Sequence, residues 1–466
     1  MDRLTRYSDG LFLTFLFLLP FQTIYLLREP LVDGEKWQYG TIGIYASAVV
    51  LALAMIFSTL SRTRDSTTGS LTQRIKGVWS DQKSDVLLVL FVLWAGLSVS
   101  WAGDRALAVY GFLMLLLAAG AYIMVQAMVR WGKDDRIVTV LILSAMIQAL
   151  IGIWQFLSQE TFASTLLGTS AHPVWQAGTS VLKYGTGRFL RAYGTFPHPN
   201  VYGLFLAMSL LLVIMRIIDM GGKPIAANAW KRAAHVAAIP ILSFGLVVSY
   251  SRLAWAGCTL GILAYGAHMF RNSFKCHPGL DSGSMDSGSQ AGMTRRYVFA
   301  TVAAIMISAG IYAGILCDTI VSRFDGAVIA QEGSVTDRMT TYRDASRVIR
   351  ESSVLGSGMW NETAELIRLD PRRPVWDIQP AHDVPLLVLT ELGIPGLFLG
   401  ILFFFQVVRD SLEMKNIALF AMLLVLLPSF LFDHFLWDSV YGTLFMAIAF
   451  GSVSIVRGLT FAEKKV

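Results

Sequence analysis

The sequence predicts an all-α polytopic integral membrane protein, and three observations support this prediction. Hydrophobic residues make up 55% of the 466 residues and charged residues only 15%, whereas a soluble domain usually has about 25% charged residues. The mean hydropathy is +0.57. The apolar runs are each roughly 20 residues long and hardly alternate, as expected for membrane-spanning helices and not for barrel strands. This composition excludes a soluble enzyme, a disordered chain and a fibrous protein.

We expect about twelve spans, beginning with an uncleaved N-terminal helix. Arg3 and Arg6 precede an apolar run at residues 11–19, as in a signal sequence, but no small-residue cleavage site follows. Each later span is an apolar run long enough to cross a bilayer. The predicted spans are residues 10–27, 39–60, 85–101, 106–129, 137–157, 197–217, 236–250, 252–270, 297–316, 385–408, 416–433 and 437–456.

The distribution of Lys and Arg predicts the orientation of these spans. Both termini and every second connection are rich in these residues, and the other short connections hold only Arg28, Lys36, Arg105 and Arg252. The positive-inside rule therefore places both termini in the cytoplasm. The same excess of cytoplasmic cations accounts for the net charge of +6 without a nucleic-acid ligand. A Ser- and Gly-rich cytoplasmic stretch at residues 281–292 is typical of a flexible linker.

Two long segments then lie outside the membrane, at residues 158–196 and 317–384. Long exposed segments are where functional residues concentrate. We divide the chain into three parts. Residues 1–184 form about five N-terminal transmembrane helices and the start of an outer segment, residues 185–400 form a core that includes the outer segment 317–384, and residues 401–466 form the C-terminal helices.

The first candidate site is a turn that enters a helix at the outer face. Arg188 and Arg191 precede residues 194–200, Gly-Thr-Phe-Pro-His-Pro-Asn. Prolines and polar residues suit a helix start, whose free N–H groups and positive dipole end favour an anion. His198 and Asn200 are candidate substrate-binding residues within this turn. The alternative is a rigid turn from which Arg191 reaches lipid headgroups.

The second candidate site is the sequence Ser-Tyr-Ser-Arg at residues 249–252, between two apolar spans. An arginine close to the hydrocarbon is costly unless it has a partner or reaches the interface. Arg252 therefore indicates either an anion site near the outer surface or a simple loop cation.

The third candidate site is an amphipathic helix predicted at residues 337–351. One face is formed by residues spaced four, three and four apart, namely Arg338, Tyr342, Ala345 and Ile349. Another face has the arginines Arg343, Arg347 and Arg350. We expect the apolar face to turn toward the transmembrane body and the second face to pair with acids in solvent. Arg338 is therefore the better candidate for binding an anion, with Tyr342 and Arg343 as its neighbours.

The fourth candidate site is His382, followed by Asp383, just before the span that begins near residue 385. Histidine can act as a general base near neutral pH. His434, between Asp433 and Asp438, is a weaker version of the same signal, and a structural role at the membrane edge is the alternative for both histidines. No His pair has metal-ligand spacing, no acidic DxD pair lies in the outer segments and the cysteines form no CxxC pair, so no metal site is predicted.

Together these motifs resemble the O-antigen ligase and polymerase superfamily, a family of Wzy_C-like bacterial polysaccharide ligases that are integral membrane glycosyltransferases. In that family an Arg precedes a Gly-Thr-Phe-x-His-Pro-Asn-like turn, and a Ser-x-Ser-Arg turn follows. A long periplasmic segment then has an Arg-led helix, a Gly-x-Gly and a His beside an Asn. The corresponding residues here are Arg191 with 194–200, 249–252, 338–349, 356–358 and His382, and the sequence Glu-Leu-Gly-Ile-Pro-Gly at 391–396 is also similar. The resemblance covers about residues 185–400, and it departs at Asp383, where Asn is usual.

The resemblance implies a GT-C-like glycosyltransferase of the bacterial inner membrane that acts at the periplasmic face in lipopolysaccharide biosynthesis. Its donor would be an undecaprenyl-diphosphate-linked glycan, and a hydroxyl of an acceptor sugar would attack the anomeric carbon with inversion. By family analogy Arg191 and Arg338 bind the diphosphate with support from Arg252, since arginine suits phosphate, and His382 takes the proton of the acceptor. The resemblance implies no metal and no other cofactor.

Three functions stay open from the sequence. Transfer to lipid A–core would make the enzyme a ligase, which we favour, and transfer to a growing glycan on a second carrier would make it a polymerase. A lipid-linked oligosaccharide flippase or transporter would also have about twelve spans, but it would place cations in a cavity along several of them. Here the arginines and His382 gather at the predicted outer face, which favours an enzyme.

Overall fold

The computed structural model describes residues 3–65, 83–221, 225–275, 314–324 with shorter stretches between 303 and 312, 334–352, 354–413 and 417–452. The predicted linker at 281–292 and much of the predicted span at 297–316 lie outside these residues. The chain forms two compact units. Unit 1 comprises Met1–Ile137, Gly333–Asn416 and Ser429–Val466, and unit 2 comprises Val138–Glu332 and Ile417–Pro428.

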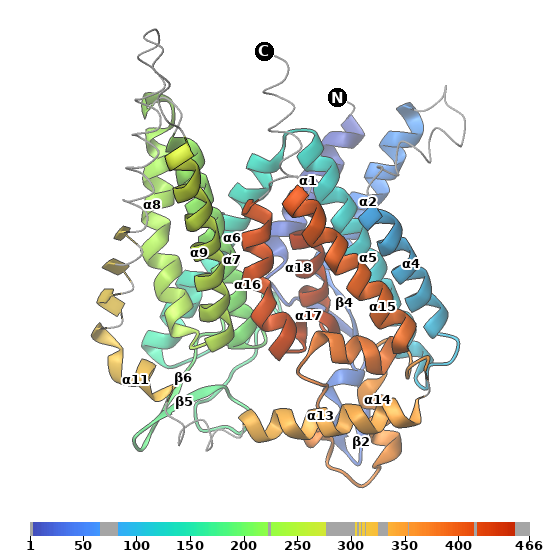
Figure 1. The fold of residues 1–466 in the computed structure, drawn as a ribbon. Helices are drawn as coiled ribbons and strands as arrows, with labels where there is room; N and C mark the ends of the chain where they lie inside the picture. Colours follow the sequence, from blue (N-terminus) through green and yellow to red (C-terminus); the bar gives the residue numbers. More distant parts are fainter. Residues whose placement is uncertain are drawn as a thin grey trace. The chain divides into compact units, whose positions relative to one another are not determined.

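Unit 1 is a bundle of apolar helices with short strands and short helices at one end (Figure 1). Helix α1 packs on α2, α4 packs on α15, and α5 packs on α18. In Figure 1, α13 runs across the direction of α5 and α15, at the end of the unit opposite the start of α1. The helices of unit 1 are α1 (Arg3–Leu18), α2 (Ala46–Asp65), α4 (Lys83–Ser98), α5 (Arg105–Arg130), α13 (Ser334–Glu351), α14 (Glu362–Leu369), α15 (Val384–Glu413), α17 (Phe435–Asp438) and α18 (Val440–Gly451), with the 3-10 turns η1 (Gln38–Gly40) and η2 (Val375–Asp377).

Two small antiparallel pairings follow α1. Strand β1 (Ile24–Arg28) pairs with β4 (Ile42–Tyr45), and β2 (Leu31–Val32) pairs with β3 (Glu35–Lys36). The two residues between β2 and β3 are Asp33 and Gly34, both with positive φ, as a tight hairpin turn requires. Arg28, at the end of β1, forms a two-pronged ion pair with Asp104, which also caps α5 by accepting a hydrogen bond from the Leu107 N–H. These contacts join the strands to the start of α5.

The described residues of unit 2 form four long helices and one hairpin. Strands β5 (Val181–Tyr184) and β6 (Gly187–Leu190) are antiparallel, with Tyr184 opposite Gly187. Helix α7 packs on α8 and α9. An added Cβ at Gly257 would lie 2.3 Å from the Val425 carbonyl oxygen, so glycine allows α9 and the first part of α16 to approach closely. The helices are α6 (Asp134–Ser158), which begins in unit 1, α7 (Pro199–Gly221), α8 (Ile225–Val248), α9 (Arg252–Lys275), α11 (Cys317–Ser322) and α16 (Ile417–Phe432), which ends in unit 1.

Among the described residues, six helical segments are long and apolar enough to cross a membrane. Three further apolar helices are shorter, at Ala46–Ser61, Ile417–Phe432 and Val440–Gly451. The mostly helical architecture is consistent with an all-α membrane protein, whereas the count of twelve spans and the long outer segment stay predictions. The six segments are Arg105–Arg130, Asp134–Ser158, Pro199–Met220, Trp230–Val248, Arg252–Arg271 and Val384–Glu413.

Several predicted spans differ from the helices observed. The span expected at residues 39–60 begins with η1 and β4, so α2 starts only at Ala46. The first helix ends at Leu18 and is followed by a strand, whereas a span over residues 10–27 was expected. Pro20 explains this difference, because the residue before a proline avoids the helical conformation. Helix α8 also differs, because it begins well before the expected start at residue 236 and ends at Val248, before the expected end at residue 250. Tyr250 adopts φ +49° in the turn that leads to α9.

Helix α15 is broken at Gly393, which has φ +67° and ψ −167°. The break frees backbone carbonyls that must find donors, because an unpaired polar group in an apolar environment is costly. The loop before α14 supplies two of these donors. The Ser357 N–H donates to the Thr390 carbonyl (2.9 Å), and the Gly358 N–H donates to the Glu391 carbonyl (2.8 Å). Trp94 donates its indole N–H to the Leu392 carbonyl at 2.8 Å. The Gly-x-Gly at 356–358 and the Glu-Leu-Gly sequence at 391–393 therefore pack directly against each other.

Candidate active site

His382 lies directly before α15, and Asp383 forms the start of that helix. The Asp383 carboxylate accepts a hydrogen bond from the Leu386 N–H at 2.7 Å, and its backbone carbonyl accepts one from Leu387 at 2.9 Å. Asp383 is thus the capping residue of α15, and burial raises the pKa of its carboxyl. An Asn side chain could accept the same bond. Asp383 can therefore cap α15 as the family's usual Asn would, and this cap positions His382.

The ring of His382 meets a second histidine. The ring centroids of His382 and His434 are 4.8 Å apart, and the planes cross at 83°. The Nδ1 atom of His382 is buried and has no hydrogen-bond partner among the described residues. Burial, the charge of His434 and the charge of Arg338 together lower the pKa of His382 to about 4, against the opposing effect of Asp433 and Asp438. His382 is therefore neutral near pH 7.

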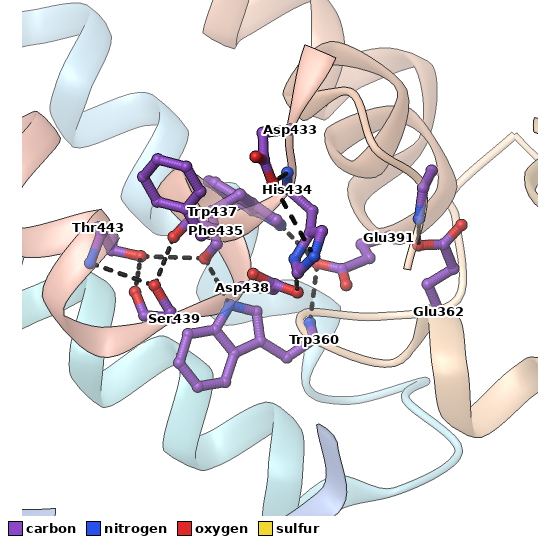
Figure 2. Close-up of polar contacts among 12 residues, drawn as sticks. Trp360, Glu362, Glu391, Asp433, His434, Phe435, Trp437, Asp438, Ser439 and Thr443 are labelled. Carbon is purple, nitrogen blue, oxygen red and sulfur yellow. Dashed lines mark hydrogen bonds and ion pairs between the residues drawn. The ribbon is translucent and has the colours of Figure 1, made fainter. Parts of the chain in front are cut away.

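His434 sits among carboxylates (Figure 2). Its Nδ1 lies 2.7 Å from an Asp438 carboxylate oxygen, and its Nε2 lies 4.0 Å from Asp433 Oδ1. Its backbone N–H donates to the same Asp433 oxygen at 2.9 Å. Burial disfavours the charged ring, but the neighbouring carboxylates outweigh it and raise the pKa of His434 to about 9. His434 is therefore protonated near pH 7, which makes it a poor base.

Two glutamates are almost completely buried behind the histidines. Glu362 accepts a hydrogen bond from the Ala381 N–H at 3.1 Å, next to His382, and its other oxygen is buried without a partner among the described residues. Burial raises the pKa of Glu362 well above its ordinary value. Glu391 accepts hydrogen bonds at one oxygen from the Trp360 N–H (2.9 Å) and the Trp437 indole N–H (2.7 Å). Figure 2 shows how these contacts join α15, α17 and the loop before α14.

Helix α13 buries a face that differs slightly from the predicted one. Its buried positions are Thr341, Asp344, Ala345 and Val348. Val348 packs with Leu366 and Ile378 in a small apolar core. Of the predicted face, Ala345 is buried, whereas Arg338, Tyr342 and Ile349 are half-buried at its edge; Arg343 and Arg350 are exposed. Arg338 and Tyr342 lie close enough to the start of α15 for electrostatic effects with His382 and Asp383.

In unit 2, Arg191 is buried at the start of α7. Its side chain is held by two hydrogen bonds. Nε donates to the Ser249 carbonyl at 2.9 Å, and one terminal nitrogen donates to the Asn200 side-chain oxygen at 2.9 Å. The structure thus brings together the Arg191 turn and the Ser-Tyr-Ser-Arg turn predicted from separate motifs. An added Cβ at Gly203 would lie 2.8 Å from the Ser249 hydroxyl oxygen, so glycine allows this approach.

His198 connects the same helix start to β5. The Asn200 N–H donates to His198 Nδ1 at 3.1 Å, and His198 Nε2 lies 2.9 Å from the Ser180 hydroxyl. Because Nδ1 accepts a hydrogen bond, the ring proton sits on Nε2 and the imidazole is neutral. The Gln155 side chain also fixes the turn, accepting from the Tyr193 and Gly194 N–H groups and donating to the Gly194 carbonyl. His198 therefore has a positioning role in the helix start.

The remaining arginines of unit 2 lie in different surroundings. Arg252, at the first residue of α9, donates to the Arg323 carbonyl at 3.2 Å. Arg323 is itself buried after α11. The Tyr250 hydroxyl lies 2.8 Å from that of Thr319, which joins the same two segments. Arg188 is exposed on β6, opposite Lys183.

An apolar cavity of about 130 Å³ lies in unit 1 among α4, α5, α15 and α18. Its wall includes Val384 and Pro385, at the start of α15, and Trp437 of α17. These residues are sequence neighbours of His382 and His434. The cavity has the apolar lining that a hydrocarbon chain requires.

Sequence reasoning identified His382 and Arg338, which share one neighbourhood, and Arg191 and Asn200, which are hydrogen-bonded. It did not single out Glu362, Glu391 or Arg323. Glu391 could have been found, because an ionisable residue inside a predicted span, here 385–408, is rare and commonly functional. Glu362 and Arg323 have no such signal, because each lies in a polar outer segment whose burial depends on tertiary packing.

The comparisons with known proteins agree with the motifs. Residues 237–401 match the family model described as O-Antigen ligase. This region includes Arg252, Arg338 and His382, whereas Arg191 and His434 lie outside it. No curated protein matches the chain at a significant level. Residues 237–401 are therefore similar to O-antigen ligases, and this match supports the resemblance to the O-antigen ligase superfamily that the motifs indicated.

Proposed function

We propose that this membrane enzyme of the O-antigen ligase and polymerase type is a metal-independent glycosyltransferase. It transfers a glycan from an undecaprenyl-diphosphate carrier to a hydroxyl of an acceptor sugar, and the favoured acceptor is lipid A–core. The observation that supports this proposal most directly is the neutral, largely buried His382, placed by the cap of α15 within electrostatic reach of Arg338. Both residues lie in the matched family region.

In the proposed reaction His382 removes the proton of the acceptor hydroxyl while its oxygen attacks the anomeric carbon. The bond between that carbon and the diphosphate oxygen breaks, and the anomeric configuration inverts. A base must be unprotonated before the reaction, and His382 meets this condition near neutral pH. An anionic diphosphate bound nearby would favour the protonated ring and so strengthen the base when substrate is present.

The leaving diphosphate gains negative charge, which arginines stabilise through paired N–H donors. As the family resemblance implies, we assign this role to Arg191 and Arg338, with Arg252 in support. Arg191 is buried and held by two hydrogen bonds, so its side chain would lose little conformational entropy on binding the diphosphate. Tyr342, Arg343, Arg188, His198 and Asn200 complete the predicted set of substrate-binding residues.

The carrier lipid needs an apolar environment beside the reacting groups. The cavity that includes Val384, Pro385 and Trp437 offers such an environment next to His382. A site that combines an apolar cavity with a base and an arginine matches a substrate that combines a hydrocarbon chain, a diphosphate and a sugar.

The test is transfer by purified variants in detergent or vesicles, with an undecaprenyl-diphosphate-linked glycan as donor. We expect Arg338→Ala and His382→Ala each to abolish transfer while membrane insertion and melting temperature are retained. Arg347→Ala, on the same helix as Arg338, is the matched control and should be mild. Normal transfer by both folded variants would overturn the proposed mechanism.

Glycan analysis of a deletion strain identifies the acceptor. Long undecaprenyl-linked chains that accumulate beside bare lipid A–core would support a ligase. Single repeat units on the core without long chains would indicate the polymerase alternative. Lipid-linked units retained at the cytoplasmic face would indicate a flippase and overturn the assignment of catalytic residues.

A further inference from the structure

His434, the second histidine of the candidate active site, is surrounded by aromatic rings and acidic side chains and not by an apolar core. Its ring centroid lies 4.8 Å from that of His382 and 6.0 Å from that of Tyr39. Its side chain is only 20% exposed. Figure 2 shows its imidazole beside the carboxylate of Asp438 in α17, with Asp433 directly before it in the chain.

The geometry fixes the charge of His434. Asp438 accepts from Nδ1 at 2.7 Å, and an Asp433 oxygen is 4.0 Å from Nε2. Two acidic side chains facing both ring nitrogens favour two N–H groups, which only the protonated imidazole has. A ring whose two nitrogens both bear protons cannot accept a third, so His434 is unsuited to act as the base.

The geometry near His382 favours the opposite state. A protonated His382 would have an N–H at Nδ1, which is buried and has no acceptor among the described residues. It would also face the positive charge of His434, and the charge of Arg338 adds to this effect. The two rings therefore differ in protonation although they are in contact.

We propose that His434 is a positioning residue for His382: a protonated ring, held by Asp438, that fixes the neighbouring imidazole and keeps it unprotonated. This inference rests on the proposed function, in which His382 is the base. The titratable and charged groups around the pair are Asp433, Asp438, Glu362 and Arg338, with Tyr39 in ring contact. Replacing His434 by a neutral residue leaves Asp433 and Asp438 acting on His382 without the opposing positive charge.

The charge of His434 can be removed while its hydrogen bond is kept. In His434→Asn, the amide nitrogen occupies about the place of Nδ1 and can still donate to Asp438. We expect the acid limb of the kcat/KM profile, which reports the free enzyme, to move to higher pH by about one unit. His434→Lys retains a positive charge, and its acid limb should stay near that of the wild-type protein.

The outcomes separate this inference from the proposed function. An unchanged acid limb in a folded His434→Asn variant, or equal shifts in the Asn and Lys variants, would overturn the role of the His434 charge. Full activity of His382→Ala would instead refute the proposed function. Loss of activity at every pH in folded His434→Asn, with His382→Ala still active, would make His434 the base and overturn both.

A measurement on the unmodified protein does not depend on the folding of variants. Histidine labelled with ¹⁵N distinguishes protonated from neutral imidazole by its ring-nitrogen shifts. Within this pair of histidines, we expect His434 to be protonated and His382 to be neutral at pH 7. A neutral His434 at this pH would overturn the inference.

Discussion

The indole N–H of Trp437 donates a hydrogen bond to the buried carboxylate of Glu391 at 2.7 Å, across 46 positions of the sequence. The same carboxylate oxygen accepts from the Trp360 N–H at 2.9 Å, and the Trp360 indole donates to the Trp437 carbonyl at 3.0 Å. Three segments are thus joined around one oxygen. Because Trp437 lies three residues after His434, this junction holds the second histidine relative to α15.

Removal of the Glu391 carboxylate should destabilise unit 1. In Glu391→Ala, the two buried donors lose their acceptor, and each unpaired buried group costs about 1–3 kcal/mol. We expect a clear decrease of the melting temperature in detergent. Glu391→Gln keeps a carbonyl oxygen and should lose less. Equal melting temperatures for the Ala and Gln variants would show that these hydrogen bonds contribute little.

Gly393 should not tolerate a side chain. An added Cβ would lie 2.0 Å from the Val354 carbonyl oxygen and 2.8 Å from the Gly356 nitrogen, and the positive φ is itself unfavourable for other residues. Because backbone atoms cannot move aside easily, Gly393→Ala should cost more than about 3 kcal/mol. Gly400→Ala is the control on the same helix, since its Cβ would make ordinary contact with Phe91 at 3.4 Å. Comparable expression and melting of the two variants would contradict the prediction.

The two arginines beside Asp344 should differ in their contribution to stability. Arg373 forms an ion pair with this buried carboxylate and is only 12% exposed, so Arg373→Ala should cost about 3 kcal/mol by leaving a buried charge unpaired. Arg347 is 42% exposed and lies 4.0 Å from Asp344. Arg347→Ala should change stability by less than about 0.5 kcal/mol. The check is the melting temperature of each variant, and a larger loss from Arg347→Ala would reverse the assignment.

Glu362 should make the protein less stable as pH rises. Burial raises the pKa of Glu362 in the folded protein well above its ordinary value near 4.5. The folded protein therefore keeps this proton where the unfolded chain has lost it, and the free energy of unfolding falls with increasing pH between those two values. In Glu362→Gln this dependence disappears, so its melting temperature relative to wild type should improve from pH 5 to pH 8. A difference that stays constant over this range would show that Glu362 is ionised in the folded protein.

Arg191 should not be replaceable by lysine. Its guanidinium donates to the Ser249 carbonyl and to the Asn200 side chain through separate nitrogens, a geometry that one ammonium group does not reproduce. We expect Arg191→Lys to reduce transfer by at least about tenfold, as expected for the loss of one charge-assisted hydrogen bond. Asn200→Ala should have a smaller effect, because the bond to Ser249 remains. Transfer assays with circular dichroism as the fold control distinguish these outcomes, and wild-type transfer by the Lys variant would refute the role of the guanidinium.

Local sequence patterns were enough to predict the class of this protein and the approximate place of most described helices. A span is encoded locally, because about 20 consecutive apolar residues are both necessary and sufficient in length to cross the bilayer. The motifs around Arg191, Arg338 and His382 were readable for a similar reason, since each is a short run of unusual residues in an apolar chain. Even Pro20, which ends α1 early, is a local signal.

Contacts between these residues, in contrast, depend on how the chain packs in three dimensions. His382 and His434 stand 52 positions apart, and whether a histidine is neutral or charged depends on what surrounds its ring, not on its sequence neighbours. Glu362 and Glu391 became important because packing buried them against specific N–H donors. Hydropathy is a sum over neighbours along the chain, whereas desolvation, ring contact and hydrogen bonding are set by neighbours in space. The protonation states on which the proposed chemistry depends therefore come from the fold.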